Sequence, residues 1–148
     1  MYFEAFSRNV NEVIDQAVAL AKRYGCRYIG SEHILFGLLK VSDGRASAIL
    51  REAGIDIDRY LIYFKRTIKR DLVISGNMFT PRTKRSFEMA AEISLKSHAG
   101  FIGTEHLLLA ILLDLESVAV TILRCFRVNI EKMTDELAQS IMGKYEDE

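Results

Sequence analysis

Two glutamates share the same local setting in this chain and are its best candidates for binding a cation. Glu32 lies in Gly-Ser-Glu-His at residues 30–33, and Glu105 lies in Gly-Thr-Glu-His at residues 103–106. A carboxylate can receive a guanidinium group through two parallel hydrogen bonds. Each motif could therefore hold an arginine side chain.

The same motif also has a purely structural interpretation, as the start of a helix. The hydroxyl of Ser31 or Thr104 can cap the helix that follows by accepting a backbone N–H. A glutamate in the first turn is stabilised by the helix dipole by roughly 0.3–1 kcal/mol. The preceding glycine, Gly30 or Gly103, would allow an unusual backbone angle before the cap.

Two further helix starts could bind an anion. Ser7 precedes a run of apolar residues at helical spacing, and Thr80 is followed by Pro81, which suits the first position of a helix. Free N–H groups at a helix start favour phosphate. A carboxylate beside such a start would suit a ligand that carries a guanidinium and a phosphate on one group.

These motifs recur because the chain is duplicated. Residues 6–68 align with residues 79–141 without a gap, so each position corresponds to the one 73 residues later. A repeat of this length indicates one structural unit used twice, with any site present at two places. We expect a single domain over 1–148, with repeat 1 at about 6–68, a connector at 69–78 and repeat 2 at about 79–141.

Each repeat is predicted to form four helices, which makes the fold all-α with eight helices. The first helix shows apolar residues at helical spacing and stops near Gly25. The second is apolar almost all round, which indicates a buried helix. A short third helix and a fourth helix capped by Asp56 follow, and Asn129 is the corresponding cap in repeat 2.

Composition excludes several classes of protein. The net charge is zero, which argues against a nucleic-acid partner. The chain contains no phosphate-binding loop of the Gly-x-x-x-x-Gly-Lys-Ser/Thr type and no HExxH metal motif, and we expect no cofactor and no metal. Cys26 and Cys125 do not correspond under the repeat and suggest two reduced thiols. Without a signal peptide or a long apolar run, we expect a cytoplasmic protein with no membrane contact.

The doubled unit resembles the Clp N-terminal repeat domain of Clp-type AAA+ unfoldases, closest to the ClpC kind. The resemblance rests on Phe-Ser/Thr near each repeat start and Ile-Gly-Ser/Thr-Glu-His-Ile/Leu-Leu in each middle, and it covers about Phe3 to Gly143. It implies an eight-helix domain with pseudo-twofold symmetry that is not an enzyme. Such a domain captures client proteins or docks adaptor proteins and passes clients to an AAA+ ATPase ring, here in cis or in trans.

In ClpC-type members, the resemblance further implies two equivalent pockets for phosphoarginine. Carried over by motif, Glu32 and Glu105 would pair with the guanidinium. The phosphate would be held at two helix starts, formed by Ser7 with Arg8 and by Thr80 with Arg82.

The two helix starts differ in one respect. Repeat 2 keeps the family pattern Phe-Thr-x-Arg at residues 79–82, whereas repeat 1 reads Phe-Ser-Arg-Asn at residues 6–9. Moving the arginine by one position rotates it by about 100° around a helix. We therefore expect the second pocket, with Glu105, to be the better one.

Three alternatives remain open at this point. The chain could dock other proteins without binding phosphoarginine, whether as part of an unfoldase or as a stand-alone protein. It could be a small hydrolase or metal enzyme that uses Glu32-His33 and Glu105-His106. It could also be a helix-turn-helix protein that binds nucleic acid, which would show a steep salt dependence.

Overall fold

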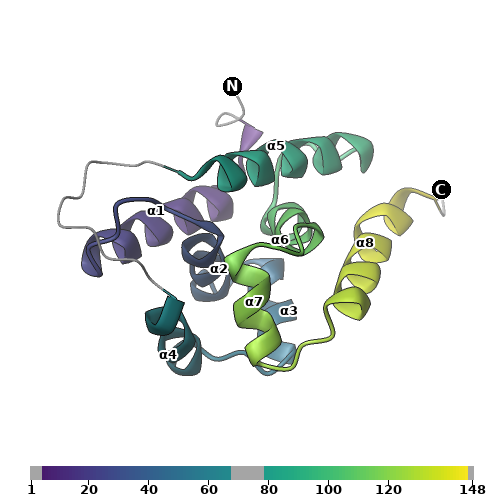
Figure 1. Cartoon of the computed structure of the whole chain (residues 1–148). Coiled ribbons are helices and arrows are strands. Elements are labelled where there is room, and N and C mark those ends of the chain that lie inside the picture. Colours follow the sequence, from purple (N-terminus) through teal and green to yellow (C-terminus); the bar gives the residue numbers. More distant parts are fainter. Residues whose placement is uncertain (1–4, 68–78, 147–148) are drawn as a thin grey trace.

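The protein is built from helices throughout the part that the structure describes. The computed structural model describes residues 5–67 and 79–146, and the predicted connector at 69–78 lies outside these ranges. The described residues form eight helices and no named strand, which confirms the predicted all-α fold (Figure 1). The helices are α1 Arg8–Arg23, α2 Ser31–Lys40, α3 Arg45–Glu52, α4 Ile57–Thr67, α5 Pro81–Lys96, α6 Thr104–Leu113, α7 Val118–Cys125 and α8 Ile130–Glu146.

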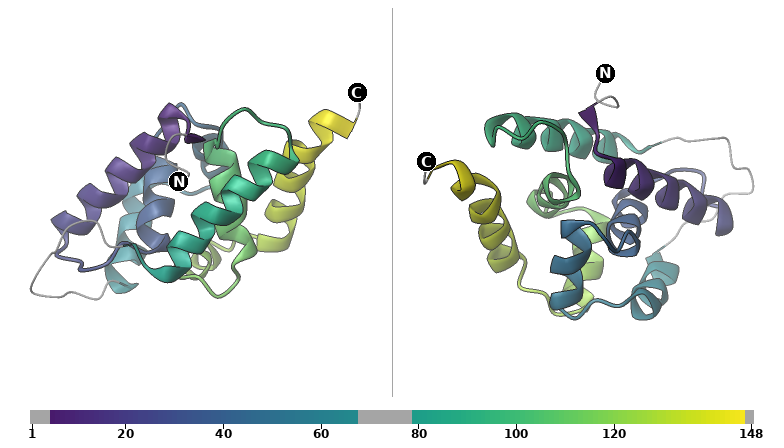
Figure 2. Two further views of the ribbon diagram at one scale, coloured as in Figure 1. Left: turned by 90° about the horizontal axis from the view of Figure 1, so that it is seen from above. Right: turned by 180° about the vertical axis from the view of Figure 1, so that it is seen from behind.

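Helices α2 and α6 form the centre of the molecule. Every residue is buried from His33 to Leu39 in α2 and from His106 to Leu112 in α6, as their apolar sequences predict. Helices α1 and α5 lie over them on one side (Figures 1 and 2). The approach of α1 to α2 is close at Gly37, where a Cβ atom would lie 2.5 Å from a backbone oxygen of α1.

The two repeats are interleaved. Phe6 forms an isolated parallel β-bridge with Ile102, and Ile29 forms one with Phe79. The N–H of Thr80 donates to the carbonyl of Ile29 over 3.0 Å. Each repeat therefore brings its opening segment to the loop that precedes the buried helix of the other repeat.

The third helix of each repeat also packs on the other repeat. Helix α7 contacts α2, and α3 contacts α6. The Ser31 hydroxyl accepts the N–H of Ala119 in α7 (3.1 Å), and the Thr104 hydroxyl accepts the N–H of Ala46 in α3 (3.2 Å). The prediction that Ser31 and Thr104 cap their own helices is therefore wrong, because each hydroxyl faces the start of a helix in the other repeat.

The start of each buried helix is capped by its histidine instead. Gly30 and Gly103 are the N-cap residues of α2 and α6. The N–H of Gly30 donates to Nδ1 of His33 over 2.9 Å, and the N–H of Gly103 donates to Nδ1 of His106 over 2.8 Å. This is the capping-box arrangement, in which the third helical residue reaches back to the N-cap.

The remaining predicted caps are confirmed. Ser7 and Thr80 cap α1 and α5 by accepting the N–H of the residue three positions later. Asp56 and Asn129 do the same for α4 and α8. Gly25 has a positive φ of 66° just past α1, which is the conformation that a helix stop requires.

Among the described residues, no single helix combines the length and apolar character needed to cross a membrane. Helices α6 and α7 would meet that standard only as a pair, and they are bent by 90° at the break between them.

Candidate functional site

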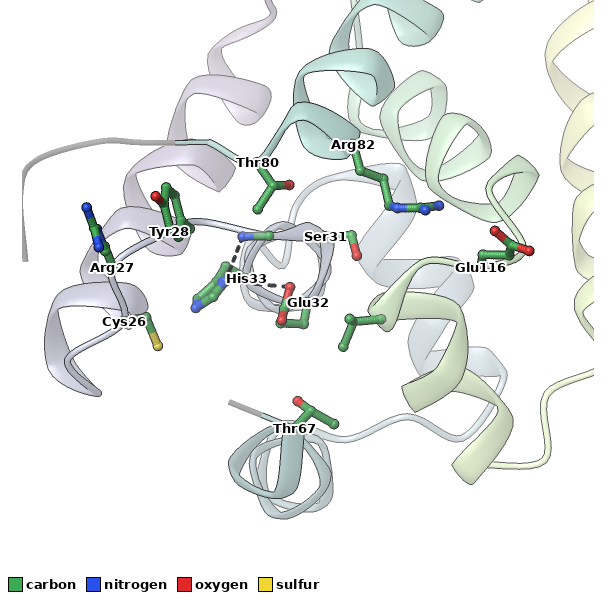
Figure 3. Close-up of a pocket in the computed structure, with 12 residues that line it drawn as sticks. Cys26, Arg27, Tyr28, Ser31, Glu32, His33, Thr67, Thr80, Arg82 and Glu116 are labelled. Carbon is green, nitrogen blue, oxygen red and sulfur yellow. Dashed lines mark hydrogen bonds and ion pairs between the residues drawn. The ribbon is translucent and has the colours of Figure 1, made fainter. Parts of the chain in front are cut away.

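A cleft of about 420 Å³ lies where the two repeats meet at the start of α2 (Figure 3). We call it the Glu32 cleft. It receives side chains from the start of α2, the end of α4, the start of α5, and α7 with the loop before it. Its lining residues are Cys26, Arg27, Tyr28, Gly30, Ser31, Glu32, His33, Thr67, Thr80, Arg82, Glu116 and Val118.

Glu32 folds back over the glycine that precedes α2. A Cβ atom on Gly30 would lie 2.0 Å from Oε1 of Glu32, and a Cβ atom on Gly103 would lie 2.2 Å from Oε1 of Glu105. The backbone at Gly30 is extended, with φ −103° and ψ −177°. The expected unusual angle is therefore absent, and glycine is needed here because the carboxylate approaches so closely.

The Glu32 carboxylate is poorly solvated and is not neutralised by a cation from the described residues. Only 13% of its side chain is exposed, and within residues 5–67 and 79–146 it pairs with no lysine or arginine. Burial raises the pKa of this carboxyl, and a hydrogen bond from its own backbone N–H partly offsets the effect. A cation that entered the cleft would stabilise the ionised carboxylate and so offset the solvation that burial has removed.

His33 is a buried residue in the lining of the Glu32 cleft, and it is uncharged at neutral pH. Burial lowers its pKa to about 4. Because Nδ1 accepts the N–H of Gly30, we assign the proton to Nε2, and this atom is buried without a hydrogen-bond partner among the described residues. The ring meets Phe64 edge-on, with centroids 5.2 Å apart. His33 thus acts as a helix cap packed in the core.

This state of His33 predicts how stability depends on pH. As the pH falls from about 6.5 to about 4, the unfolded chain takes up a proton at His33 that the folded chain does not, so the free energy of unfolding should fall. The slope reaches up to about 1.4 kcal/mol per pH unit. Glu32 acts in the opposite direction, because its raised pKa lets the folded chain bind a proton more readily.

Urea unfolding of the parent and of His33→Gln between pH 7 and pH 4.5 isolates the histidine. Glutamine is a usual capping-box residue at this position, so the cap is kept while the titration is lost. We expect a flatter pH dependence in His33→Gln. Equal slopes in the two proteins would contradict the assignment.

Thr80 and Arg82 bring the start of α5 to the same cleft, on the opposite side from Thr67 (Figure 3). The Thr80 hydroxyl accepts the N–H of Thr83 over 3.1 Å. Arg82 is half-buried and donates from Nη1 to the carboxylate of Asp114 at the end of α6. The guanidinium group has further donors that this contact leaves available.

The second glutamate lies in a smaller cleft of about 220 Å³, which we call the Glu105 cleft. It is lined by Arg45, Ser97, Ala99, Gly100, Phe101, Glu105, His106 and Ile141. Glu105 is already paired there, because Nη1 of Arg45 donates to its Oε2 over 3.3 Å.

The helix start of α1 does not line either cleft. Ser7 caps α1, and Arg8 is exposed and pairs with Glu12 at 3.3 Å. Neither is among the residues that line the Glu32 or Glu105 cleft.

The structure thus combines the candidate residues differently from the sequence-based expectation. It brings Glu32 of repeat 1 together with Thr80 and Arg82 of repeat 2, whereas we expected Thr80 and Arg82 to serve Glu105. The interleaving at Ile29 and Phe79 is the physical reason. Val118 and Arg45, which correspond under the repeat and line the two clefts, were missed. Reading each cleft position against its counterpart 73 residues away would have found them.

The structure offers no support for a metal site in the described part of the chain. The pairs Glu32-His33 and Glu105-His106 belong to no group of three or more His, Cys, Asp or Glu side chains able to hold a metal ion among these residues.

The comparisons with known proteins place this all-helical chain in a family of repeat domains. The chain belongs to the Clp repeat (R) N-terminal domain family, whose model matches residues 5–126 and 78–147. This confirms the resemblance seen in the sequence.

Two sequence relatives agree with this family, and one solved structure shares the fold. A probable ATP-dependent Clp protease ATP-binding subunit of Chlamydia pneumoniae is 38% identical over 143 residues, covering 94% of this chain and 17% of that protein. ClpC/MecB of Bacillus subtilis, a negative regulator of genetic competence, is 30% identical over 147 residues, covering 99% of this chain and 18% of that protein. The ClpV N-domain in complex with a VipB peptide has the same fold, with a TM-score of 0.74 at 18% identity over 95% of this chain and 88% of that one. The chain therefore spans about one sixth of the length of the Chlamydia pneumoniae and Bacillus subtilis proteins.

Proposed function

We propose that this chain is the substrate- and adaptor-recognition module of a Clp unfoldase and that its Glu32 cleft binds phosphoarginine on marked client proteins. In this role it is a binding module and not an enzyme. It would hand clients to an AAA+ ATPase ring, carried either on the same polypeptide or by a partner. The similarity to ClpC/MecB and to a ClpV N-domain that binds a peptide supports a protein-binding role.

One observation carries the choice of ligand. The Glu32 cleft combines a largely buried carboxylate with a helix start and an arginine, Arg82, in one cavity. The carboxylate suits a guanidinium group, and Arg82 with the N-terminal turn of α5 suits a phosphate. Phosphoarginine joins these two groups directly, so one small ligand satisfies both sides of the cleft.

The second candidate is docking of proteins without phosphoarginine, and the contact of Arg82 with Asp114 favours it. An arginine committed to a carboxylate has less to offer a phosphate. The site would then keep its glutamates only for their place in the first turn of α2 and α6.

Isothermal titration with free phosphoarginine, with arginine and with phosphoserine separates the two. The proposal expects saturable binding of phosphoarginine and affinities at least about 10-fold lower for the other two, because each lacks one of the paired groups. Binding of phosphoarginine no stronger than that of arginine would leave only the docking function.

A further inference from the structure

Residues of the two clefts correspond under the repeat, so the side chains at equivalent positions can be compared. Under the 73-residue correspondence, Glu32 matches Glu105 and Thr67 matches Ser140. In the same way, Val118 matches Arg45. Val118 and Thr67 line the Glu32 cleft, whereas Arg45 lines the Glu105 cleft and lies next to Ser140.

In the Glu105 cleft, a guanidinium group of the chain itself occupies the site. Arg45 donates from Nη1 to Oε2 of Glu105 over 3.3 Å and from Nη2 to the hydroxyl of Ser140. One guanidinium is thus held between a carboxylate on α6 and a hydroxyl on α8. The pair is partly shielded, since only 20% of the Glu105 side chain is exposed.

In the Glu32 cleft, the equivalent acceptors are present and the arginine is replaced by valine. The Thr67 hydroxyl donates to the carbonyl of Phe64 over 2.8 Å, which leaves its lone pairs able to accept. It is on the side of the α4 end that faces Glu32 (Figure 3). The two acceptors of Arg45, Glu105 and Ser140, therefore correspond to Glu32 and Thr67, which both line the Glu32 cleft beside an uncharged side chain.

We propose that Arg45 closes the Glu105 cleft by taking the place of a ligand guanidinium, so that the domain binds one phosphoarginine, at Glu32, and not two. The contacts of Arg45 further assign Thr67 as the second acceptor for that ligand. The identity of the ligand rests on the proposed function. The guanidinium site formed by Glu32 and Thr67, which we call the guanidinium seat, is inferred from the contacts of Arg45. The start of α1 lies beside the loop before α6, because the N–H of Ser7 donates to the carbonyl of Ile102 over 2.9 Å. It carries Asn9 where repeat 2 has Arg82, so the counterpart of Arg82 is missing there.

Titration with phosphoarginine of variants at Val118 and Arg45 tests the proposal. The parent should bind about one equivalent, and Val118→Arg should weaken binding about 100-fold, because the introduced guanidinium would pair with Glu32. Ser42→Arg, which adds the same charge at an exposed loop position outside both clefts, should stay within about 3-fold of the parent. Arg45→Val combined with Asn9→Arg should raise the number of sites to about two. Two sites in the parent, or unchanged affinity in Val118→Arg, would overturn the proposal.

A second measurement requires no ligand and keeps this proposal separate from the proposed function. Val118→Arg and Glu32→Gln are combined in a double-mutant cycle of urea unfolding, with Arg45→Val and Glu105→Gln as the matched cycle in the other cleft. Both cycles should show favourable coupling of at least about 2-fold in the unfolding constant. If coupling appears while phosphoarginine does not bind, the guanidinium seat stands and the proposed ligand is wrong. Absence of coupling in either cycle would overturn the inference.

Discussion

Glu32→Gln should weaken phosphoarginine binding by about 100-fold or more without weakening the fold. Removing one member of a desolvated charge pair costs about 2–5 kcal/mol of binding free energy, because the ligand guanidinium is left without its counter-charge. The stability should stay equal or rise at pH 7. Burial raises the pKa of Glu32, so ionising it in the folded chain costs free energy that the neutral glutamine avoids. Titration calorimetry and urea unfolding measure the two effects.

Glu105→Gln is the matched control for this prediction. It changes the corresponding residue in the other repeat, where Arg45 already holds the carboxylate. Binding should stay within about 3-fold of the parent, because the Glu32 cleft is untouched. If Glu105→Gln abolished binding and Glu32→Gln did not, the ligand would belong to the other cleft.

Removing both hydroxyls that join the repeats should produce the largest loss of stability. Ser31 and Thr104 accept the backbone N–H groups of Ala119 and Ala46, and both alanines are fully buried. A buried N–H left without an acceptor costs about 1–3 kcal/mol. If the two sites are independent, Ser31→Ala with Thr104→Val should lose about 2–6 kcal/mol.

Urea unfolding of the two single variants and the double variant measures this loss. Ser42→Ala, at an exposed loop position, is the control and should stay within about 0.5 kcal/mol of the parent. A double variant as stable as this control would show that the hydroxyls do not join the repeats. A Thr104→Val loss without a Ser31→Ala loss would show that only α3 depends on such a cap.

The helices themselves were readable from the sequence because their signals are local. Apolar spacing defined the faces of α1 and α4, and the all-round apolar runs identified α2 and α6 as buried. Asp56 and Asn129 capped the helices that they precede, as predicted. Each of these signals is contained within a few neighbouring residues.

The partners of Ser31 and Thr104 could not be read in the same way. Each hydroxyl stands at the place of an N-cap, yet its hydrogen bond goes to a residue 88 or 58 positions away in the sequence. Local propensity describes what such a residue can accept, and only the packing of α7 on α2 and of α3 on α6 decides what it does accept.

The candidate site shows the same division between local and long-range information. The sequence singled out Glu32, Thr80 and Arg82 by type, and all three line one cleft. It did not reveal that they come from different repeats, because the bridge between Ile29 and Phe79 joins segments 50 residues apart. The difference between Arg45 and Val118 was visible in the duplicated alignment, but its meaning depends on which carboxylate each residue faces.

A crystal structure of the domain with phosphoarginine tests the central claim most directly. We predict one ligand, with its guanidinium against Glu32 and Thr67 and its phosphate at Arg82 and the first turn of α5, while Arg45 remains on Glu105. A ligand bound to Glu105 with Arg45 displaced, or both clefts empty at a saturating concentration, would contradict the account.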